Sequence, residues 1–352
     1  MKKILILVEN FKVGGAQNMV CELVKNLDDK RVDYKVICYR KEYGSDLEEK
    51  ISKYTKVEYL DVPGRIGPLK YFKVLRAISK FKPDVVHAHL SAQIFSIGWG
   101  FLHNKPMLIT AHTTPEKAFI KKTEGLLKLG LKRRKYYIAA VSKSNQDKTR
   151  KYFGLDEAKC FCVNNGIDLD LFKKKPHDDF TFINVATHNE NKNQMAILRC
   201  FAKLINEYPN AKLYLVGDGE LHSKLMELAK ELKVSESVYF PGSVADVHNY
   251  YALSDVYVQA SHREAMPLSV LEAMATSLPI ISTNVGGLAD VVKENGLLIE
   301  DDEEKLFSAM KKMISTDQNT LDKMGELSKS IVQSYSSVEM ANKYMEIYEK
   351  IC

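Results

Sequence analysis

The sequence lacks the features that mark disulfide-stapled, zinc-binding or low-complexity proteins. Its 352 residues contain no CxxC pair and no short-period repeat. The six cysteines are scattered: Cys21, Cys38, Cys160, Cys162, Cys200 and Cys352. This pattern favours reduced thiols in a core over a disulfide framework or a zinc site. A composition with 45% hydrophobic and 27% charged residues is that of an ordinary globular protein.

Long apolar runs are also missing. Residues 4–8 form an apolar run of five, which is shorter than the roughly 7 to 15 residues in the core of a signal peptide. The longest other run, residues 94–102, falls well short of the roughly 20 residues that a spanning helix needs. We therefore expect a soluble, cytoplasmic protein.

An excess of positive charge occurs in one place only. Residues 121–137 carry seven basic residues and one acidic residue, an excess equal to the net charge of +6 for the whole chain. Lys132, Arg133 and Arg134 lie in this segment beside several leucines. The segment suits either an anionic membrane surface or an ordinary solvated helix face docked by its leucines. The remaining chain has no spare charge with which to follow nucleic-acid phosphates, so we expect no nucleic-acid partner.

The order of apolar runs predicts the fold class. The length exceeds the roughly 250 to 300 residues at which one core stops growing, so two domains are expected. Short strand-like runs alternate with amphipathic segments throughout, which predicts an α/β protein with two doubly wound, Rossmann-like parallel-sheet domains facing across a cleft. We place the domains at residues 1–166 and 180–335. Residues 167–179 are polar and lysine-rich and read as a linker. The predicted strands are residues 4–9, 34–40, 57–62, 84–90, 107–112, 137–142, 160–166, 180–187, 212–219, 237–242, 256–261, 279–284 and 296–300.

Loops that follow strands in the first half hold the first candidate site residues. Gly14 and Gly15 allow a turn that opens a helix, where free N–H groups favour an anion, although a plain tight turn explains them equally well. The third glycine of a dinucleotide-binding motif is missing, so NAD binding has little support. His87, His89 and His112 end two strands, and polar contacts with a substrate are favoured over zinc.

The linker contains an Asp-x-Asp pattern at Asp168 and Asp170. It resembles a metal and diphosphate clamp, but it does not follow a buried strand. We interpret it as a turn and helix cap, with metal binding as the lesser alternative.

In the second half, Lys192 lies at a strand-to-helix turn and can neutralise a phosphate, although a surface lysine would look the same. Gly217 and Gly219 occupy the next such turn and would allow a ligand to approach closely.

The segment "SHREAMPLSVLEAMA" indicates a nucleotide-sugar site. Glu264 follows a predicted strand, and a helix should begin near Pro267, so that the N–H groups of residues 268–270 face an anion. These are Leu268, Ser269 and Val270. Glu272 lies within an apolar helix, where an exposed surface glutamate is not expected. One carboxylate on each side of a diphosphate could bind the sugar hydroxyls and the ribose, respectively.

Taken together, these residues resemble the retaining glycosyltransferases of family 4, which have the GT-B fold. The resemblance covers essentially the whole chain. It rests on the two glutamates with seven residues between them, and on "GGAQ", "DVVHAH", "AVSKSNQDKTRKYFG", "VNNGID", Lys192, "LVGDGEL" and "VGG".

The resemblance implies residue roles. Glu264 would contact the donor sugar without being a covalent nucleophile, and Glu272 would bind the ribose. Lys192 and the N–H groups of residues 268–270 would hold the diphosphate without a metal or any other cofactor. His112 and the Gly14–Gly15 loop would close over the reacting centre. A last helix, residues 336–352, would return to the first domain.

One departure from the family pattern concerns phosphate binding. An arginine is usual five residues before the lysine, where this chain has Thr187. We hypothesise that Arg263 or His188 supplies the missing positive charge.

The expected function is transfer of a hexose or N-acetylhexosamine from a nucleotide-diphosphate sugar, UDP rather than GDP, to a glycan or lipid-linked acceptor of a cell-envelope polysaccharide. His89 and the basic residues Lys132 to Arg134 are expected on the acceptor and membrane side, with peripheral attachment to the inner face of the membrane. Two alternatives remain: a GT-B-like UDP-sugar epimerase, and a non-catalytic nucleotide-sugar-binding partner protein.

Overall fold

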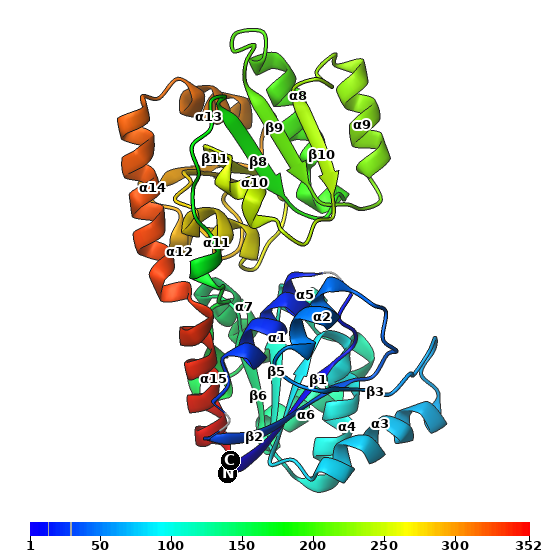
Figure 1. Cartoon of the computed structure of the whole chain (residues 1–352). Coiled ribbons are helices and arrows are strands. Elements are labelled where there is room, and N and C mark those ends of the chain that lie inside the picture. The colour runs from blue at the N-terminus through cyan, green and yellow to red at the C-terminus, as the bar shows by residue number, and fades with distance from the viewer. Residues whose placement is uncertain (13, 29) are drawn as a thin grey trace. The chain divides into compact units, whose positions relative to one another are not determined.

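The computed structural model describes residues 1–12, 14–28 and 30–352, which form two compact units (Figure 1). Unit 1 comprises Met1–Gly166 together with Ser337–Cys352, and unit 2 comprises Ile167–Ser336. Each unit is built on one parallel sheet, with seven strands in unit 1 and six in unit 2. The predicted α/β class with two doubly wound parallel sheets is confirmed, and so is every strand predicted from an apolar run.

The sheet of unit 1 has the order β3-β2-β1-β4-β5-β6-β7. Chain order reverses between β1 and β4, so the sheet is doubly wound. Every strand pair is parallel and in simple register, for example Ile6 beside His87 in β1 and β4. The strands are β1 Lys2–Val8, β2 Val32–Cys38, β3 Val57–Tyr59, β4 Val85–His89, β5 Met107–Ala111, β6 Tyr136–Ala140 and β7 Cys160–Cys162.

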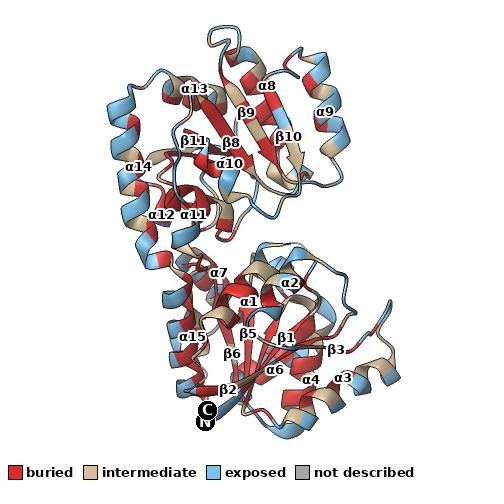
Figure 2. Cartoon of the chain, viewed as in Figure 1, coloured by how far each residue is buried: buried red, intermediate tan, exposed pale blue. Residues whose placement is uncertain are grey.

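Helices cover both faces of this sheet, because alternate residues of its strands belong to different cores. Leu5 and Leu7 pack in one cluster, whereas Ile4 and Ile6 pack in another. In Figure 2 the strands are accordingly buried while the outer helix faces are exposed. The helices are α1 Gly15–Lys25, α2 Asp46–Ser52, α3 Pro68–Phe81, α4 Gln93–His103, α5 Pro115–Ala118, α6 Glu124–Arg133, α7 Lys143–Phe153 and α15 Ser337–Ile351.

The last helix, α15, is part of unit 1. Its Tyr344 and Tyr348 are fully buried in the same cluster as Ile4 and Ile6. They are four residues apart and so lie on one side of the helix. The chain therefore completes the core of its first unit with its last 16 residues.

The sheet of unit 2 has the order β10-β9-β8-β11-β12-β13, and its strand pairs are again parallel. Its core is assembled from β8, β9, β11 and the helices α8 and α13, with Phe182 and Phe201 among its fully buried members. The strands are β8 Thr181–Val185, β9 Lys212–Val216, β10 Val238–Gly242, β11 Val256–Gln259, β12 Ile280–Thr283 and β13 Gly296–Ile299. The helices are α8 Gln194–Leu204, α9 His222–Glu231, α10 His248–Ala252, α11 Leu268–Ala275, α12 Leu288–Val291, α13 Glu303–Ile314 and α14 Gln318–Val332.

Residues 167–179, predicted as a linker, lie at the start of unit 2 and contact the rest of that unit. Phe172 is buried, with its ring centroid 5.9 Å from that of Tyr251. Lys174 Nζ lies 3.3 Å from Asp255 Oδ1, and the Lys175 N–H donates to the Ala252 carbonyl. One aromatic anchor and one ion pair thus fix this segment on unit 2, and a count of polar residues could not reveal them.

Short 3-10 turns connect several elements, and one of them explains the Asp-x-Asp pattern. Asp168 caps the turn Leu169–Leu171, because its carboxylate accepts from the Asp170 N–H at 3.3 Å. The interpretation as a turn and helix cap is confirmed. In the part of the chain that the structure describes, no helix has the length and apolar character to cross a bilayer.

Candidate nucleotide-sugar site

The main candidate site lies in unit 2, where loops follow β8, β9, β11 and β12. The carboxyl ends of parallel strands lie along one edge of a sheet, which is the usual place for ligands in doubly wound folds. Lys192 comes from the loop after β8, and Glu264 comes from the loop after β11, which pairs directly with β8. The topology therefore brings residues 72 positions apart into one site.

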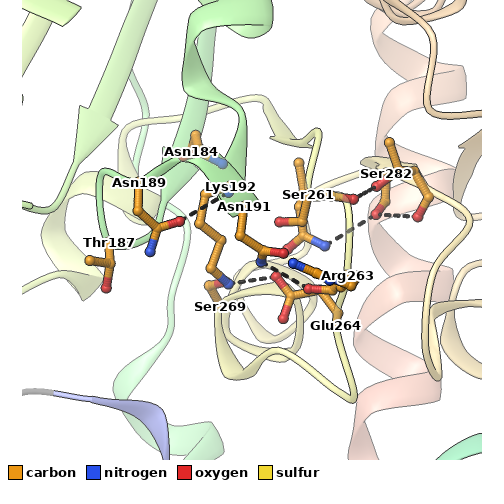
Figure 3. Close-up of polar contacts among 12 residues, drawn as sticks. Asn184, Thr187, Asn189, Asn191, Lys192, Ser261, Arg263, Glu264, Ser269 and Ser282 are labelled. Carbon is orange, nitrogen blue, oxygen red and sulfur yellow. Dashed lines mark hydrogen bonds and ion pairs between the residues drawn. The ribbon is translucent and has the colours of Figure 1, made fainter. Parts of the chain in front are cut away.

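Lys192 and Glu264 form an ion pair. Lys192 Nζ donates to Glu264 Oε1 at 2.5 Å, and the two side chains are only 21% and 11% exposed (Figure 3). Each charge is thus largely removed from solvent and satisfied by the other. An anionic ligand would compete with the Glu264 carboxylate for the Lys192 ammonium group. The released carboxylate could then accept hydrogen bonds from hydroxyl groups, so the pair suits a ligand that carries an anion next to hydroxyl groups.

Backbone contacts hold the Lys192 loop against the Glu264 loop. Asn189 Oδ1 accepts from the Lys192 N–H at 3.1 Å and caps the turn Glu190–Lys192. Asn191 Nδ2 donates to the Arg263 carbonyl at 3.0 Å (Figure 3). The His262 N–H donates to the Asn191 carbonyl at 2.8 Å. The loops are therefore joined at three successive residues, 262–264. Sequence analysis missed Asn189 and Asn191; their position just before Lys192, typical of capping residues, was the available signal.

Gly217 and Gly219 lie close to the backbone of this loop. A Cβ at Gly217 would lie 2.0 Å from the Ala186 carbonyl oxygen, and one at Gly219 would lie 2.4 Å from that of His188. Their φ angles of 132° and 157° also disfavour other residues. Glycine is thus needed at Gly217 for the close approach of the protein's own loop after β8, and the donor-binding role of Gly217 stays a prediction.

Two further glycines support Glu264. A Cβ at Gly286, whose φ is 64°, would lie 2.3 Å from the Glu264 carbonyl oxygen. The next residue, Gly287, donates its N–H to the Ala265 carbonyl at 2.7 Å. The "VGG" segment after β12 therefore fixes the backbone that carries Glu264.

The second glutamate is anchored inside α11. Glu272 is 9% exposed, and its Oε2 accepts from the phenol of Tyr251 at 3.0 Å. The Tyr251 hydroxyl also lies 3.0 Å from the Ser269 carbonyl, which links the carboxylate to the first turn of α11. Burial and the adjacent carboxylate together raise the pKa of Tyr251 well above its usual value, so it remains a hydrogen-bond donor. Tyr251 was not identified from the sequence, because a tyrosine in a short helix carries no motif.

Helix α11 begins at Leu268, one residue after Pro267, which occupies the N-cap position. No side chain caps this end of the helix. The N–H groups of Leu268, Ser269 and Val270 are the donors that have no acceptor within a helix. Ser269 Oγ lies 2.8 Å from the Tyr257 hydroxyl, which fixes its side chain beside Glu264 in the loop (Figure 3).

Several buried polar atoms around the ends of β8 and β11 have no hydrogen-bond partner within the described protein. They are Asn184 Oδ1, His188 Nε2, Asn191 Oδ1, Gln194 Oε1 and Ser261 Oγ. Unpaired buried polar groups are costly, and proteins normally satisfy them with water or a ligand. This concentration of unpaired atoms indicates a polar occupant.

The residues proposed to replace the missing arginine differ in their suitability. Thr187 itself is exposed. His188 is fully buried, with its Nδ1 3.0 Å from that of His222, and burial lowers its pKa to about 4. His188 is therefore neutral near pH 7, which favours Arg263 as the group that supplies the positive charge. Arg263 is exposed, and its guanidinium has no ion-pair partner among the described residues.

In unit 1, Gly14 precedes α1 with a φ of 154°, and Gly15 is the first helical residue. No side chain caps this helix start. Val13, which belongs to the same predicted turn, lies outside the described residues.

His87, His89 and His112 of unit 1 lie in a row, with the ring centroids of neighbouring members 4.1 and 5.3 Å apart. His112, directly after β5, is half-buried, and its Nε2 lies 3.0 Å from Nδ1 of His89. His89 is 1% exposed, so the expectation that its side chain meets an acceptor directly is wrong. Burial lowers the pKa of His112 to about 4 and holds that of His89 well below its usual value. Within the described residues, no group of three or more His, Cys, Asp or Glu side chains is arranged to hold a metal ion.

The basic segment adopts the amphipathic helix α6. Leu127 and Leu131 are buried, whereas Leu126 is 48% and Leu129 is 39% exposed. Lys132 and Arg133 are exposed at its end. Arg134 instead packs on the Phe101 ring at 4.1 Å and donates to the Phe101 carbonyl, so it mainly serves the fold.

Comparison with known proteins agrees with this geometry. The family model described as "Glycosyl transferases group 1" matches residues 168–330, and the one described as "Glycosyltransferase Family 4" matches residues 13–171. The chain belongs to the family 4 glycosyltransferases. The two models together account for both units of the enzyme, and the expectation from the resemblance is confirmed.

Relatives of this glycosyltransferase occur in archaea and bacteria. A glycosyltransferase of Methanocaldococcus jannaschii is 30% identical over 60% of this chain, and the aligned part spans 58% of that protein. The N-acetylgalactosamine-N,N'-diacetylbacillosaminyl-diphospho-undecaprenol 4-alpha-N-acetylgalactosaminyltransferase of Campylobacter jejuni is 25% identical over 90% of this chain and 92% of its own length.

Among solved structures, Anabaena HepE in complex with UDP and glucose is similar to this glycosyltransferase with a TM-score of 0.85, at 20% identity over 99% of this chain and all of that one. At this identity the likeness establishes a shared GT-B fold.

Proposed function

We propose that this glycosyltransferase is a retaining enzyme that transfers a hexose or N-acetylhexosamine from a nucleotide-diphosphate sugar, UDP rather than GDP, without a metal ion. The observation that carries the proposal is the buried Lys192–Glu264 pair beside the helix that holds Glu272. Lys192 pairs with Glu264, and Glu272 is anchored separately by Tyr251, so the site offers one cation for a diphosphate and a separate carboxylate for each of the sugar and the ribose.

Each part of the donor has a partner in this assignment. The diphosphate takes the ammonium group of Lys192 and the N–H groups at the start of α11, where the helix dipole favours an anion. When Lys192 turns to the phosphates, Glu264 becomes available to accept hydrogen bonds from sugar hydroxyls. Glu272, held in place by Tyr251, accepts from the ribose. Exposed Arg263 adds the positive charge that Thr187 does not supply.

The names of related proteins support the substrate classes. HepE is described in complex with UDP and glucose, and the Campylobacter enzyme by a diphospho-undecaprenol acceptor. By analogy, a UDP-sugar is the first donor to test, and a polyprenyl-diphosphate-linked glycan, an envelope polysaccharide intermediate, is the first acceptor.

A lipid-linked acceptor would bring the enzyme to a membrane surface. Helix α6 suits this role, because Leu126 and Leu129 are exposed beside Lys132 and Arg133. Apolar side chains next to basic ones attach a helix to an anionic leaflet. We place the enzyme in the cytoplasm, peripherally on the inner face of the membrane.

The proposal is tested by thermal stabilisation with UDP, GDP and a panel of their sugars, each with and without a chelator. A ligand that binds only the folded state raises the melting temperature according to its affinity. We expect one UDP-sugar to stabilise the protein equally with and without chelator. Stabilisation that requires a divalent ion would contradict the metal-free site.

Product analysis with the stabilising donor then separates the alternatives. Transfer to a lipid-linked acceptor with the anomeric configuration kept supports the proposal, whereas an epimer formed from the donor alone would indicate an epimerase. Donor binding without turnover on any acceptor would indicate a non-catalytic binding protein.

A further inference from the structure

A line of buried polar side chains lies beneath α15 in unit 1. His87 and His89 lie on the same face of β4, and their ring centroids are 4.1 Å apart. Thr110 of the neighbouring β5 is the register partner of His89, and His112 follows two residues later. From the helix side, Tyr344 and Tyr348 contact this line, with the Tyr344 ring centroid 4.9 Å from that of His87.

At the His87 end of this line, both ring nitrogens of the histidine have hydrogen-bond partners. His87 Nδ1 lies 2.7 Å from the Tyr348 hydroxyl, and its Nε2 lies 2.7 Å from Thr110 Oγ1. Thr110 Oγ1 is in turn 3.0 Å from the Tyr344 hydroxyl. Both ring nitrogens of His87 therefore have hydrogen-bond partners. The His87 ring, which lies next to that of His89, cannot rotate without losing a hydrogen bond.

At the other end of the line, which His89 and His112 form, one buried nitrogen has no hydrogen-bond partner among the described residues. His89 Nδ1 and His112 Nε2 are 3.0 Å apart and share one proton. His89 Nε2 is buried and has no hydrogen-bond partner in the part of the chain that the structure describes. The position of the shared proton decides whether this buried atom is a bare lone pair or an N–H group.

The two arrangements differ in cost. If His112 donates from Nε2, neutral His89 must carry its proton on Nε2 as a buried N–H without an acceptor. If His89 donates from Nδ1, only an unused lone pair is buried. Orphaned buried donors are rarer than under-satisfied acceptors, because a donor loses its single hydrogen bond entirely. The second arrangement is favoured, and it leaves neutral His112 with its proton on Nδ1.

We propose that His89 is a positioning residue that fixes the tautomer of His112, so that neutral His112 carries its proton on Nδ1 and offers this N–H to an oxygen atom of a bound substrate. The inference rests on the proposed glycosyltransferase function and on the role that the resemblance implies for His112, which is to close over the reacting centre. His89 acts without touching substrate, in the way that partners behind a ligating or catalytic histidine fix its tautomer and ring orientation. Burial holds His112 neutral at physiological pH, so the group presented is a hydrogen-bond donor and not a cation.

The tautomer can be measured directly. Long-range ¹H–¹⁵N spectra of histidine-labelled protein distinguish protonated from bare ring nitrogens, and His112→Gln assigns the His112 signals among the nine histidines. We expect His112 to be protonated on Nδ1 at pH 7.5. His112 protonated on Nε2 would overturn the proposal, and this result needs no variant at His89.

Two variants at His89 then test its role. His89→Asn places an amide N–H close to the position of Nδ1 and should keep the His112 tautomer. His89→Leu fills the volume but offers no donor, so the His112 proton should move toward Nε2, the form that neutral histidine prefers in water. An unchanged His112 tautomer in folded His89→Leu would also overturn the proposal.

Activity gives the second readout. With the stabilising donor, we expect His89→Leu to lower kcat about tenfold or more with little change in KM, and His89→Asn to retain most of it, as for other partners behind a catalytic group. Equal losses in both variants would indicate a packing role only. The failure of the wild type to turn over any donor, with the Nδ1–H tautomer intact, would contradict the proposed function and leave the tautomer assignment standing.

Discussion

Lys192 Nζ and Glu264 Oε1 are joined at 2.5 Å across the pair of strands β8 and β11. The cation proposed to bind phosphate is therefore already neutralised by the carboxylate proposed to bind sugar. When a sugar nucleotide binds, the Lys192–Glu264 ion pair would be replaced by contacts of Lys192 with phosphate and of Glu264 with the sugar. Neither charged side chain would then be left buried and unpaired.

This exchange predicts opposite ligand profiles for the two glutamates. Glu272→Ala should weaken bare UDP and UDP-sugar alike, by about tenfold to a hundredfold for lost hydrogen bonds to a charged group. Glu264→Gln should weaken only the intact sugar nucleotide and should leave UDP as tight or tighter, because Lys192 is released. Calorimetric titration of both ligands measures this, and identical profiles for the two variants would contradict the assigned roles.

Arg263 and His188 make a second contrast. Removing the exposed guanidinium with Arg263→Ala should weaken UDP by about tenfold at low salt, with a smaller effect at high salt because of screening. His188→Gln removes no positive charge and should leave the salt dependence of UDP binding as in the wild type. Unchanged UDP affinity in Arg263→Ala across salt concentrations would show that another group replaces the missing arginine.

Acid should destabilise the protein through its buried histidines. Burial lowers the pKa of His188 and His112 to about 4, whereas an unfolded histidine titrates near 6.5. Between these values the unfolded chain binds more protons than the folded chain, so the free energy of unfolding falls as pH decreases from about 7 to about 4. Urea denaturation across this range should show a shallower decline in His188→Gln, while His248→Gln serves as the matched control. An identical slope in wild type and His188→Gln would contradict the neutral, buried state of His188.

Gly286 should be intolerant of any side chain. Gly286→Ala would place a Cβ 2.3 Å from the Glu264 carbonyl at a φ of 64°, so the loop that carries Glu264 must shift. We expect a folded protein with at least tenfold weaker sugar-nucleotide binding, since a small displacement of a positioning group is costly. Gly125→Ala is the control, because nothing lies within 4 Å of its Cβ position in α6. Wild-type affinity in Gly286→Ala would show that the loop adapts.

Membrane attachment should depend on the exposed end of α6. Replacing Lys132 and Arg133 together by alanine should weaken binding to vesicles with anionic lipid by roughly 2 kcal/mol, or about thirtyfold at low salt. The control is alanine at Lys224 and Lys230, two exposed lysines of α9. Vesicle sedimentation measures both, and equal losses would indicate attraction by net charge alone.

The spacing of apolar residues and the turn residues between apolar runs were enough to predict the α/β class and all the strands. Parallel strands that are buried on both faces are continuous apolar runs, which can be recognised in the sequence. The pattern from Glu264 to Glu272 likewise predicted a strand end followed by a helix start, and the structure has β11 end at Gln259 and α11 begin at Leu268. The sequence left Arg263 and His188 open as the replacing cation, because burial, which lowers the pKa of His188, has no local signature. It also could not show that Phe172 contacts Tyr251, because these residues are 79 positions apart.

The sequence by itself determined the fold class, the family and the segments that carry the site, since these follow from local periodicity, turn residues and short-range spacing. Only the tertiary structure decided which charges are paired, which histidines are neutral and which glycines lie against the backbone of another loop. Those properties depend on desolvation and on contacts between distant segments, such as Lys192 with Glu264 and Tyr348 with His87. Pairings between residues far apart along the chain have no signature in its local pattern.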